Sequence, residues 1–121
     1  KASSHEFDMM MLGWNADTDS PHSFFEIFQA KNPMNYAQYN NAQYEKLVNQ
    51  AIVEGNPTKQ YDLYLQAEKL LVADDAGFIP LYYASKVYVQ RSYVVDLYRH
   101  PYGPEYTLKW AYLRKGGAKE E

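Results

Sequence analysis

The stretch Phe7–Asp19, FDMMMLGWNADTD, organises the rest of the chain. Residues 7–12 form an apolar run, interrupted only by Asp8, that is long enough for one buried strand. Trp14 closes this run, and a polar turn that contains Asp17 follows it. A buried strand that ends in an aromatic residue and a carboxylate often places them at the ligand-facing edge of a sheet. The stretch therefore predicts a strand with a ligand-facing turn at its end.

Composition narrows the classes of protein. The chain has 121 residues, about one domain, and a net charge of −3, which provides no basic surface for nucleic acid. It has no cysteine, which excludes disulfides and thiolate metal sites and is compatible with an exported bacterial protein. The 13 tyrosines suit half-buried surfaces and binding faces. No apolar run reaches the roughly 18 residues of a transmembrane helix. The chain starts at Lys1 without Met, and we expect it to be a piece of a longer polypeptide.

The first of two central helices is predicted over residues 44–53. Its apolar residues recur at the spacing of one buried helix face. Asn40 or Asn41 can cap its start, and Gly55 fits the position after its end, where glycine adopts a positive φ without steric cost. The expected buried face consists of Tyr44, Leu47, Val48, Ala51 and Ile52.

A second helix is predicted over residues 58–73, directly after the first. Asn56 can cap it, and Pro57 suits the first helical position because the N–H that proline lacks would be unpaired there. The short junction implies that the two helices pack against each other. The expected buried face consists of Tyr61, Tyr64, Leu65, Leu71 and Val72.

One shorter helix and several strands complete the expected order of elements. Ser20 can cap a helix that buries Phe24, Phe25 and Phe28. After the central helices the pattern becomes extended. Strands are expected over residues 86–90, 94–98 and 107–113, with an edge strand or an irregular entry over residues 78–84, a turn-rich loop over residues 100–106 and a disordered tail over residues 114–121.

No group of residues indicates catalysis, a metal site or a cofactor. The histidines His5, His22 and His100 are not spaced as metal ligands on one helix. Phosphate-binding glycine loops and nucleophile motifs are absent, so we do not expect an enzyme. Judged without other information, Asp17 is a turn residue that bonds its own backbone, and Trp14 is part of the core. A ligand-facing role for both is the alternative.

The order of residues 13–24, GWNADTDSPHSF, resembles the Gly-Trp-x-Ala-Asp-x-x-x-Pro-x-x-Phe stretch of bacterial oligopeptide-binding proteins. These proteins are the extracytoplasmic solute-binding subunits (family 5) of ABC importers, a family that also holds dipeptide and nickel binders. Three later stretches resemble the same family in the same order. They are residues 39–47 (YNNAQYEKL), 64–71 (YLQAEKLL) and 79–83 (IPLYY). The resemblance covers residues 7–113.

The resemblance implies an α/β fold, namely the C-terminal part of a two-lobed periplasmic-binding-protein-like (type II) fold with central helices and flanking short strands. Residues 1–87 would belong to the C-terminal ligand-binding lobe, and the strands over residues 88–113 would return toward the first lobe. Strands that lack their sheet neighbours can refold locally or pair with another copy. We therefore expect the chain to self-associate.

The resemblance also implies a function, which is the capture of short peptides for uptake by a cognate ABC permease. Asp17 would bind the peptide's α-ammonium, Trp14 would lie beside its first residues, and Asn15 would offer backbone hydrogen bonds. The location would be the periplasm, or the cell surface as a lipoprotein. Some relatives carry an arginine at the position of Met11 that can meet the peptide's carboxylate, so ligand length and class stay open.

Alternatives to peptide capture remain at this point. Within the same family the ligand could be a dipeptide, nickel or a sugar. Outside it, the chain could be a tyrosine-rich domain for protein interaction or carbohydrate binding.

Overall fold

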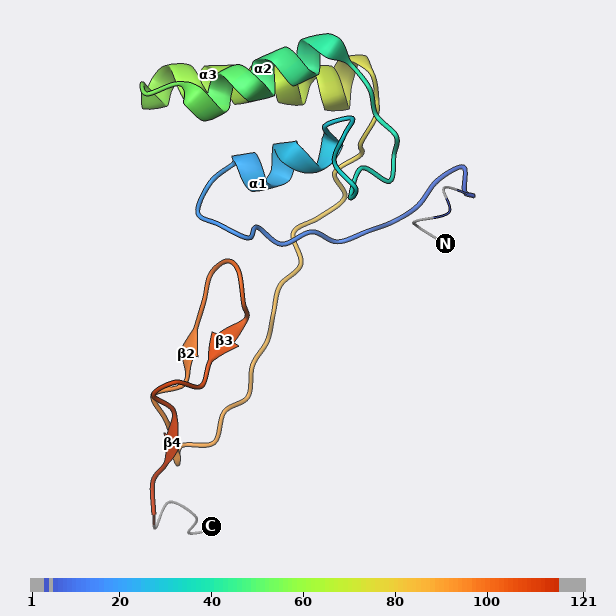
Figure 1. Cartoon of the computed structure of the whole chain (residues 1–121). Coiled ribbons are helices and arrows are strands. Elements are labelled where there is room, and N and C mark those ends of the chain that lie inside the picture. Colours follow the sequence, from blue (N-terminus) through green and yellow to red (C-terminus); the bar gives the residue numbers. More distant parts are fainter. Residues whose placement is uncertain (1–3, 5, 116–121) are drawn as a thin grey trace. The chain divides into compact units, whose positions relative to one another are not determined.

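The computed structural model describes Ser4 and residues 6–115. The chain divides into two compact units, Lys1–Leu81 and Tyr82–Glu121. Within the described residues, the first unit contains all the helices and the second contains only short strands (Figure 1). His5 and residues 116–121 of the expected tail lie outside the described residues.

Helices α2 (Ala42–Val53) and α3 (Pro57–Glu68) form the centre of the first unit. The side-chain oxygen of Asn41 accepts the backbone N–H groups of the second and third residues after it, at 2.8 and 3.2 Å. Asn56 caps α3 in the same way, with both distances 3.1 Å, and Pro57 follows at the first helical position. Both predicted helices and the predicted junction between them are therefore confirmed.

The end of α2 differs from the prediction. Glu54 adopts an extended conformation (φ −74°, ψ 120°) and stops the helix by itself. Gly55 does not have the expected positive φ, which among the glycines of the described residues occurs at Gly103. An extended residue after the last turn leads the chain directly to the next asparagine cap, so no left-handed residue is needed.

The core joins α2 and α3 to the loop before α2. Tyr44 and Val48 are fully buried, and Ala67 of α3 packs against them. The predicted α2 face is confirmed except at Ile52, which is half exposed. The core cluster consists of Tyr39, Tyr44, Leu47, Val48, Ala67 and Leu71.

The predicted face of α3 is only partly confirmed. Tyr64 and Leu71 are buried, but Tyr61 and Leu65 are 60% and 43% exposed. The two exposed residues are not part of the core cluster, and Ala67 of α3 belongs to it instead. A small residue such as Ala67 lets the backbones of α2 and α3 approach each other. The prediction missed Ala67 because it considered only large apolar residues.

A π-helical turn, η3 (Lys69–Asp74), extends α3. Ala76 then turns the chain with a φ of 50°, and the Gly77 N–H donates to the Leu71 carbonyl at 2.8 Å. A Cβ at Gly77 would lie 2.7 Å from a ring carbon of Tyr39, so only glycine leaves room for that ring.

Asp75 ties the end of η3 to the start of α2. One of its carboxylate oxygens accepts the Tyr39 hydroxyl at 2.7 Å and the Asn41 amide at 2.6 Å. These hydrogen bonds hold the pKa of Asp75 below its usual value. Burial, followed by the hydrogen bond to Asp75, raises the pKa of Tyr39 well above its usual value.

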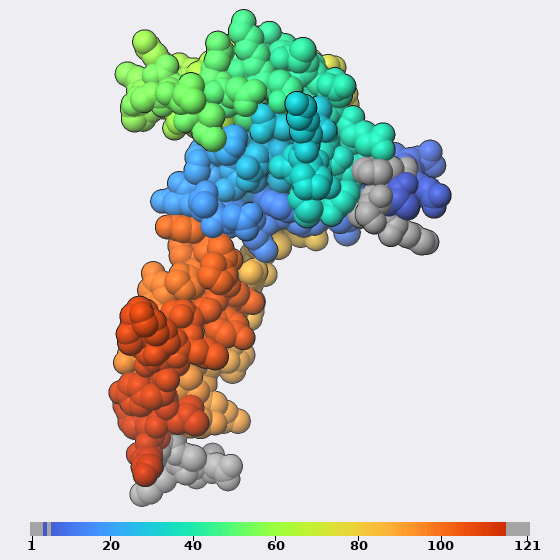
Figure 2. All heavy atoms as spheres, viewed as in Figure 1, coloured from blue at the N-terminus to red at the C-terminus, as the bar shows by residue number. Residues whose placement is uncertain are grey.

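The first helix is shorter than predicted. It comprises α1 (His22–Phe25) and a 3₁₀ turn, η2 (Glu26–Phe28). Phe25 and Phe28 pack against the core as expected, whereas Phe24 is 46% exposed. The Tyr44 hydroxyl donates to the Phe25 carbonyl at 2.7 Å, which fastens α1 to α2. Figure 2 shows the atoms of these two helices (blue and green) in contact.

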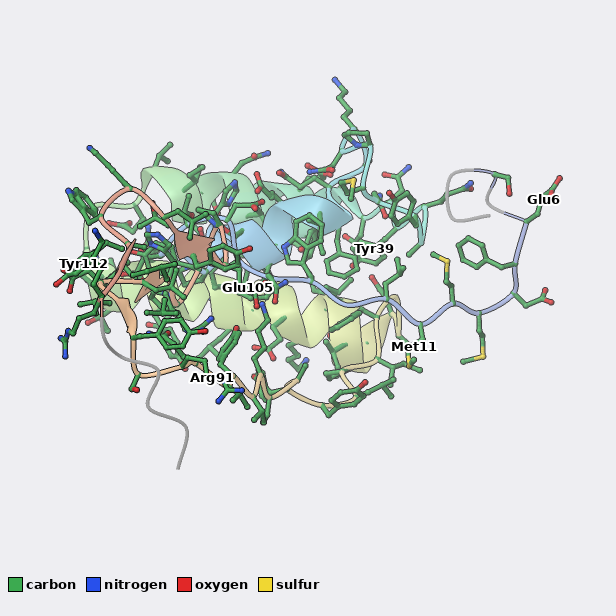
Figure 3. The ribbon with its side chains drawn as sticks, turned by 90° about the horizontal axis from the view of Figure 1, so that it is seen from below. Glu6, Met11, Tyr39, Arg91, Glu105 and Tyr112 are labelled. Atoms are coloured by element: carbon green, nitrogen blue, oxygen red, sulfur yellow. The ribbon has the colours of Figure 1, made fainter. Side chains whose placement is uncertain are left out.

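The predicted strand over residues 7–12 is absent. This stretch has no regular secondary structure, and Met9 and Met11 are 81% and 70% exposed. Figure 3 draws the stretch as plain coil and labels Met11 in it. An extended segment becomes a strand only when another strand pairs with its backbone groups, and no described strand pairs with this one. The strand expected over residues 86–90 is absent for the same reason, and residues 78–84 form the irregular entry and not the edge strand.

The second unit contains two small antiparallel sheets. Strand β1 (Val94–Val95) pairs with β4 (Tyr112–Leu113), and β2 (Tyr98–Arg99) pairs with β3 (Tyr106–Thr107). The predicted loop over residues 100–106 is confirmed as the connection of the β2–β3 hairpin. Each of the last two predicted strands is split into parts of two short strands. In the later one a turn separates the parts, and in this turn the Ala111 N–H donates to the Leu108 carbonyl.

Candidate functional site

The polar turn after residues 7–12 is anchored onto α1. The indole N–H of Trp14 donates to the carbonyl oxygen of Ser23 at 2.8 Å. The Thr18 and Ser23 hydroxyls are 2.9 Å apart and share a hydrogen bond. Ser23 is almost fully buried, so both anchors are partly shielded from competing water. The segment from Trp14 to Thr18 is therefore held at both ends against one residue of the helix.

The two polar candidates lie between these anchors. Asn15 and Asp17 are exposed, whereas Trp14 is partly buried. Within the described residues Asp17 makes no hydrogen bond or ion pair, so it is not occupied with bonding its own turn. The arrangement presents an unpaired carboxylate on a braced loop that also carries an aromatic ring. Such a group can accept hydrogen bonds from a cationic ligand group.

Sequence reasoning missed the two residues that brace this loop. Ser23 stands among phenylalanines in the first turn of a helix, and Thr18 is one of several polar residues in the turn. At helical spacing Ser23 falls on the side opposite Phe25 and Phe28, so the predicted apolar stripe gave no signal of its burial. A polar side chain that becomes buried has to find a partner.

A hollow of about 280 Å³ opens in the loop between η2 and α2. Its buried amide, Asn35, is used for structure, because it donates to the Tyr39 carbonyl at 2.8 Å and accepts the Tyr39 N–H at 3.0 Å. The lining carries no charged side chain, in contrast to the turn at Asp17. It consists of Ala30, Asn32, Pro33, Asn35, Gln38, Tyr39 and Asn40.

Metal and membrane features can be stated for the part of the chain that the structure describes. No group of three or more His, Asp or Glu residues is close enough there to hold a metal ion. His22 instead lies 3.7 Å from the carboxylate of Glu26, one helical turn away. No helix among the described residues is both long and apolar enough to cross a bilayer.

Comparison with known proteins identifies relatives of the chain. No protein-family model matches it. The dipeptide-binding protein DppE of Bacillus subtilis is 36% identical over 106 residues, which are 88% of this chain and 19% of that protein. The probable deoxycholate-binding periplasmic protein YgiS of Escherichia coli is 32% identical over 89 residues, 74% of this chain and 16% of that protein. A solved structure of Listeria monocytogenes OppA bound to peptide matches with a TM-score of 0.81 and 34% identity, covering 94% of this chain and 21% of that one.

These matches agree with the resemblance of the four sequence stretches. The chain spans about a fifth of the length of the relatives it matches. The structural match also confirms the predicted fold class, because the described helices and short strands correspond to part of an α/β solute-binding fold. The chain therefore belongs to the family of bacterial extracytoplasmic solute-binding proteins that includes the oligopeptide- and dipeptide-binding proteins.

Proposed function

We propose that the chain is part of the solute-binding subunit of an ABC importer and takes part in capturing short peptides outside the cytoplasm. The observation that carries this proposal is its likeness, over 94% of its length, to an oligopeptide-binding protein solved with a peptide. The subunit would act as a binder and not as an enzyme, as its relatives do. Its partners would be the peptide and the cognate permease.

Asp17 would pair with the α-ammonium of the bound peptide. Its carboxylate is exposed and has no partner among the described residues, so it is free to accept one. An ammonium group that is buried on binding needs such a partner, and a charge-assisted hydrogen bond is among the strong ones.

Trp14 and Asn15 would complete this end of the site. Trp14 is fixed by its indole N–H to Ser23, so its ring can flank the first peptide residue without a further loss of side-chain freedom. Asn15 would contribute backbone hydrogen bonds, which all peptides can accept. Pairing through the peptide backbone gives affinity without sequence choice.

The setting of the subunit is also part of the proposal. It would lie in the periplasm, or on the cell surface as a lipoprotein. Residues 1–87 would belong to its C-terminal ligand-binding lobe, and residues 88–113 would return toward the other lobe. The chain by itself would self-associate, because large apolar side chains such as Tyr83, Val87 and Val89 are more than 80% exposed.

One alternative to a peptide ligand is a bile acid. A relative with 32% identity is named for deoxycholate, a bile acid that carries a carboxylate and no ammonium group. If this chain served such a ligand, the carboxylate of Asp17 would repel it. The free carboxylate therefore favours a ligand with a positive end. A protein-interaction or carbohydrate-binding domain is not favoured, since the matched relatives are named as solute binders.

A double-mutant cycle tests the role of Asp17. The full-length protein that contains this chain is titrated by calorimetry as the native form and as Asp17→Asn, each with a free and an N-acetylated peptide. Losing one partner of a buried charge pair costs about 2–5 kcal/mol, so either change alone should weaken binding by roughly 30-fold or more. The two losses should not add, because both remove the same pair.

Asp19→Asn is the matched control. Asp19 is also exposed and lies in the same turn, so its change alters net charge equally but should leave affinity within about twofold. Equal binding of the acetylated and free peptides would refute the role of Asp17. Tight binding of deoxycholate with no binding of peptides would refute the ligand class. The isolated chain should bind no peptide measurably.

A further inference from the structure

Residues 78–90 form a long extended segment whose backbone is unpaired. No backbone hydrogen bond within the described residues involves this stretch. Figure 1 draws it as plain coil between η3 and the first strand of the second unit. Exposed N–H and C=O groups on an extended segment are a template for pairing with another strand.

One face of residues 86–90 is already held by the second unit. The Tyr88 hydroxyl donates to Glu105 at 2.9 Å, and the Arg99 guanidinium lies 3.8 Å from the centre of the Tyr88 ring. The Lys86 ammonium is 3.9 Å from the same Glu105 carboxylate, which Figure 3 labels. The Gln90 amide donates to the carbonyl oxygen of the first residue of β1 at 2.9 Å. The even-numbered side chains therefore fix this segment in an extended conformation.

The opposite face is bare. Val87 and Val89 are 89% and 95% exposed, although they alternate with side chains that have partners. Side chains of an extended segment point alternately to opposite faces, so these two valines lie on one face. Valine is a residue that pairs well across neighbouring strands. The segment thus resembles a strand with one face in polar contact with the second unit, one exposed apolar face and a free backbone edge.

The sequence around Tyr88 is nearly symmetric. In S-K-V-Y-V-Q-R, residues 85–91, a valine stands on each side of the tyrosine. If two copies pair antiparallel about Tyr88, Val87 of each lies opposite Val89 of the other, and Lys86 lies opposite the neutral Gln90. Such a pairing obeys two-fold symmetry, uses one surface on both copies and places no like charges opposite each other.

We propose that residues 85–91 are a self-complementary edge through which two copies of this chain pair antiparallel about Tyr88. The proposal rests on the self-association proposed above and assigns a surface and a register to it, but it does not depend on peptide binding. A pairing of this length is smaller than the roughly 1,200–2,000 Å² of a stable interface. The dimer should therefore be weak and concentration-dependent.

Charge placement tests the register. In Val87→Lys/Val89→Lys, the symmetric pairing sets an ammonium opposite an ammonium twice. In Val87→Lys/Val89→Glu, it sets an ammonium opposite a carboxylate twice. Sedimentation equilibrium of the full 121-residue chain should show about tenfold weaker dimerisation for the first variant and near-native dimerisation for the second. Both changes are at exposed positions, so the fold should be unaffected, which circular dichroism checks.

A matched control separates register from general surface charge. Val53→Lys changes an 81% exposed valine at the end of α2 and should leave dimerisation unchanged. High salt should restore part of the dimerisation of Val87→Lys/Val89→Lys, because added ions screen repulsion between exposed charges.

Cysteine pairing gives an independent readout, because the chain has no cysteine of its own. Under mild oxidation, a mixture of Val87→Cys and Val89→Cys chains should cross-link between the two variants several-fold faster than either variant cross-links with itself. Directly opposite residues have the short separation that a disulfide needs, whereas two copies of position 87 stand on a diagonal.

Each outcome is decisive. A clean monomer at high concentration overturns both the self-association and the paired edge. If all the charge variants dimerise equally well and the cysteine mixture shows no preference, the chain self-associates, but not through residues 85–91. Weakening by both double variants alike overturns the antiparallel register.

Discussion

Leu47→Ala should strongly destabilise the first unit. Leu47 is 5% exposed and lies in the cluster that joins α2 and α3. Its neighbours cannot easily move into the space that the change leaves. The Tyr44 hydroxyl is held by the Phe25 carbonyl and the Tyr39 hydroxyl by Asp75, both at 2.7 Å. Because the surrounding side chains cannot fill the cavity, we expect the substitution to lower the free energy of unfolding by an amount in the upper half of the range of about 2–5 kcal/mol.

Urea unfolding followed by far-ultraviolet circular dichroism measures this loss. A unit of roughly 80 residues has a total stability of about 4–12 kcal/mol, so the change should remove a large share of it. With an m-value of about 1 kcal/mol per M, the midpoint should fall by roughly 3.5–5 M.

Ile52→Ala is the control for this prediction. Ile52 is on the same helix but is 51% exposed, so its truncation should cost less than about 1 kcal/mol. Equal losses from the two substitutions would refute the assignment of the buried face of α2, and with it the explanation of how the two helices pack.

Two further predictions concern the first unit and use the same urea titration. Burial is the largest cause that raises the pKa of Tyr44 above its usual value of 10.0, so its protonated form stabilises the fold below that pH and the stability is lost as the pH rises further. The urea midpoint should be steady from about pH 7 to 9 and fall above about pH 10, and Tyr44→Phe should make the fall shallower; an unchanged slope would contradict this cause. Asn56→Ala should cost about 1 kcal/mol as the loss of a helix cap, and Asn41→Ala should cost more because its amide also donates to Asp75 at 2.6 Å. Equal costs would show that the bond to Asp75 contributes nothing.

Local signals in the sequence predicted the helical part of the fold. The caps Asn41 and Asn56 act on N–H groups two and three residues away, and Pro57 restricts its own φ. Such effects depend only on neighbours in sequence, so one chain is enough to see them. The burial of Tyr44 and Val48 followed from spacing for the same reason.

Strands could not be predicted in the same way. Residues 7–12 and 86–90 have the residue types of strands, but a strand also needs a partner, and its partner is not encoded in its own pattern. The proposed site is an intermediate case. Trp14 and Asp17 are proposed from their order in the chain, whereas the bracing role of Ser23 depends on α1 lying against the turn.

The Ala76-Gly77 pair shows why the order of two small residues matters. Ala76 has the φ of 50° that glycine would adopt more readily, while Gly77 is needed for the close approach of the Tyr39 ring. Exchanging the two residues would relax the backbone at one position and drive a methyl group into an aromatic ring at the next. The strain at Ala76 is therefore the lesser of two steric conflicts, and a second glycine there would remove it while adding freedom to the unfolded chain. The φ at position 76 favours glycine, and the space at position 77 requires it. In this chain the glycine stands at position 77, where the lack of space decides.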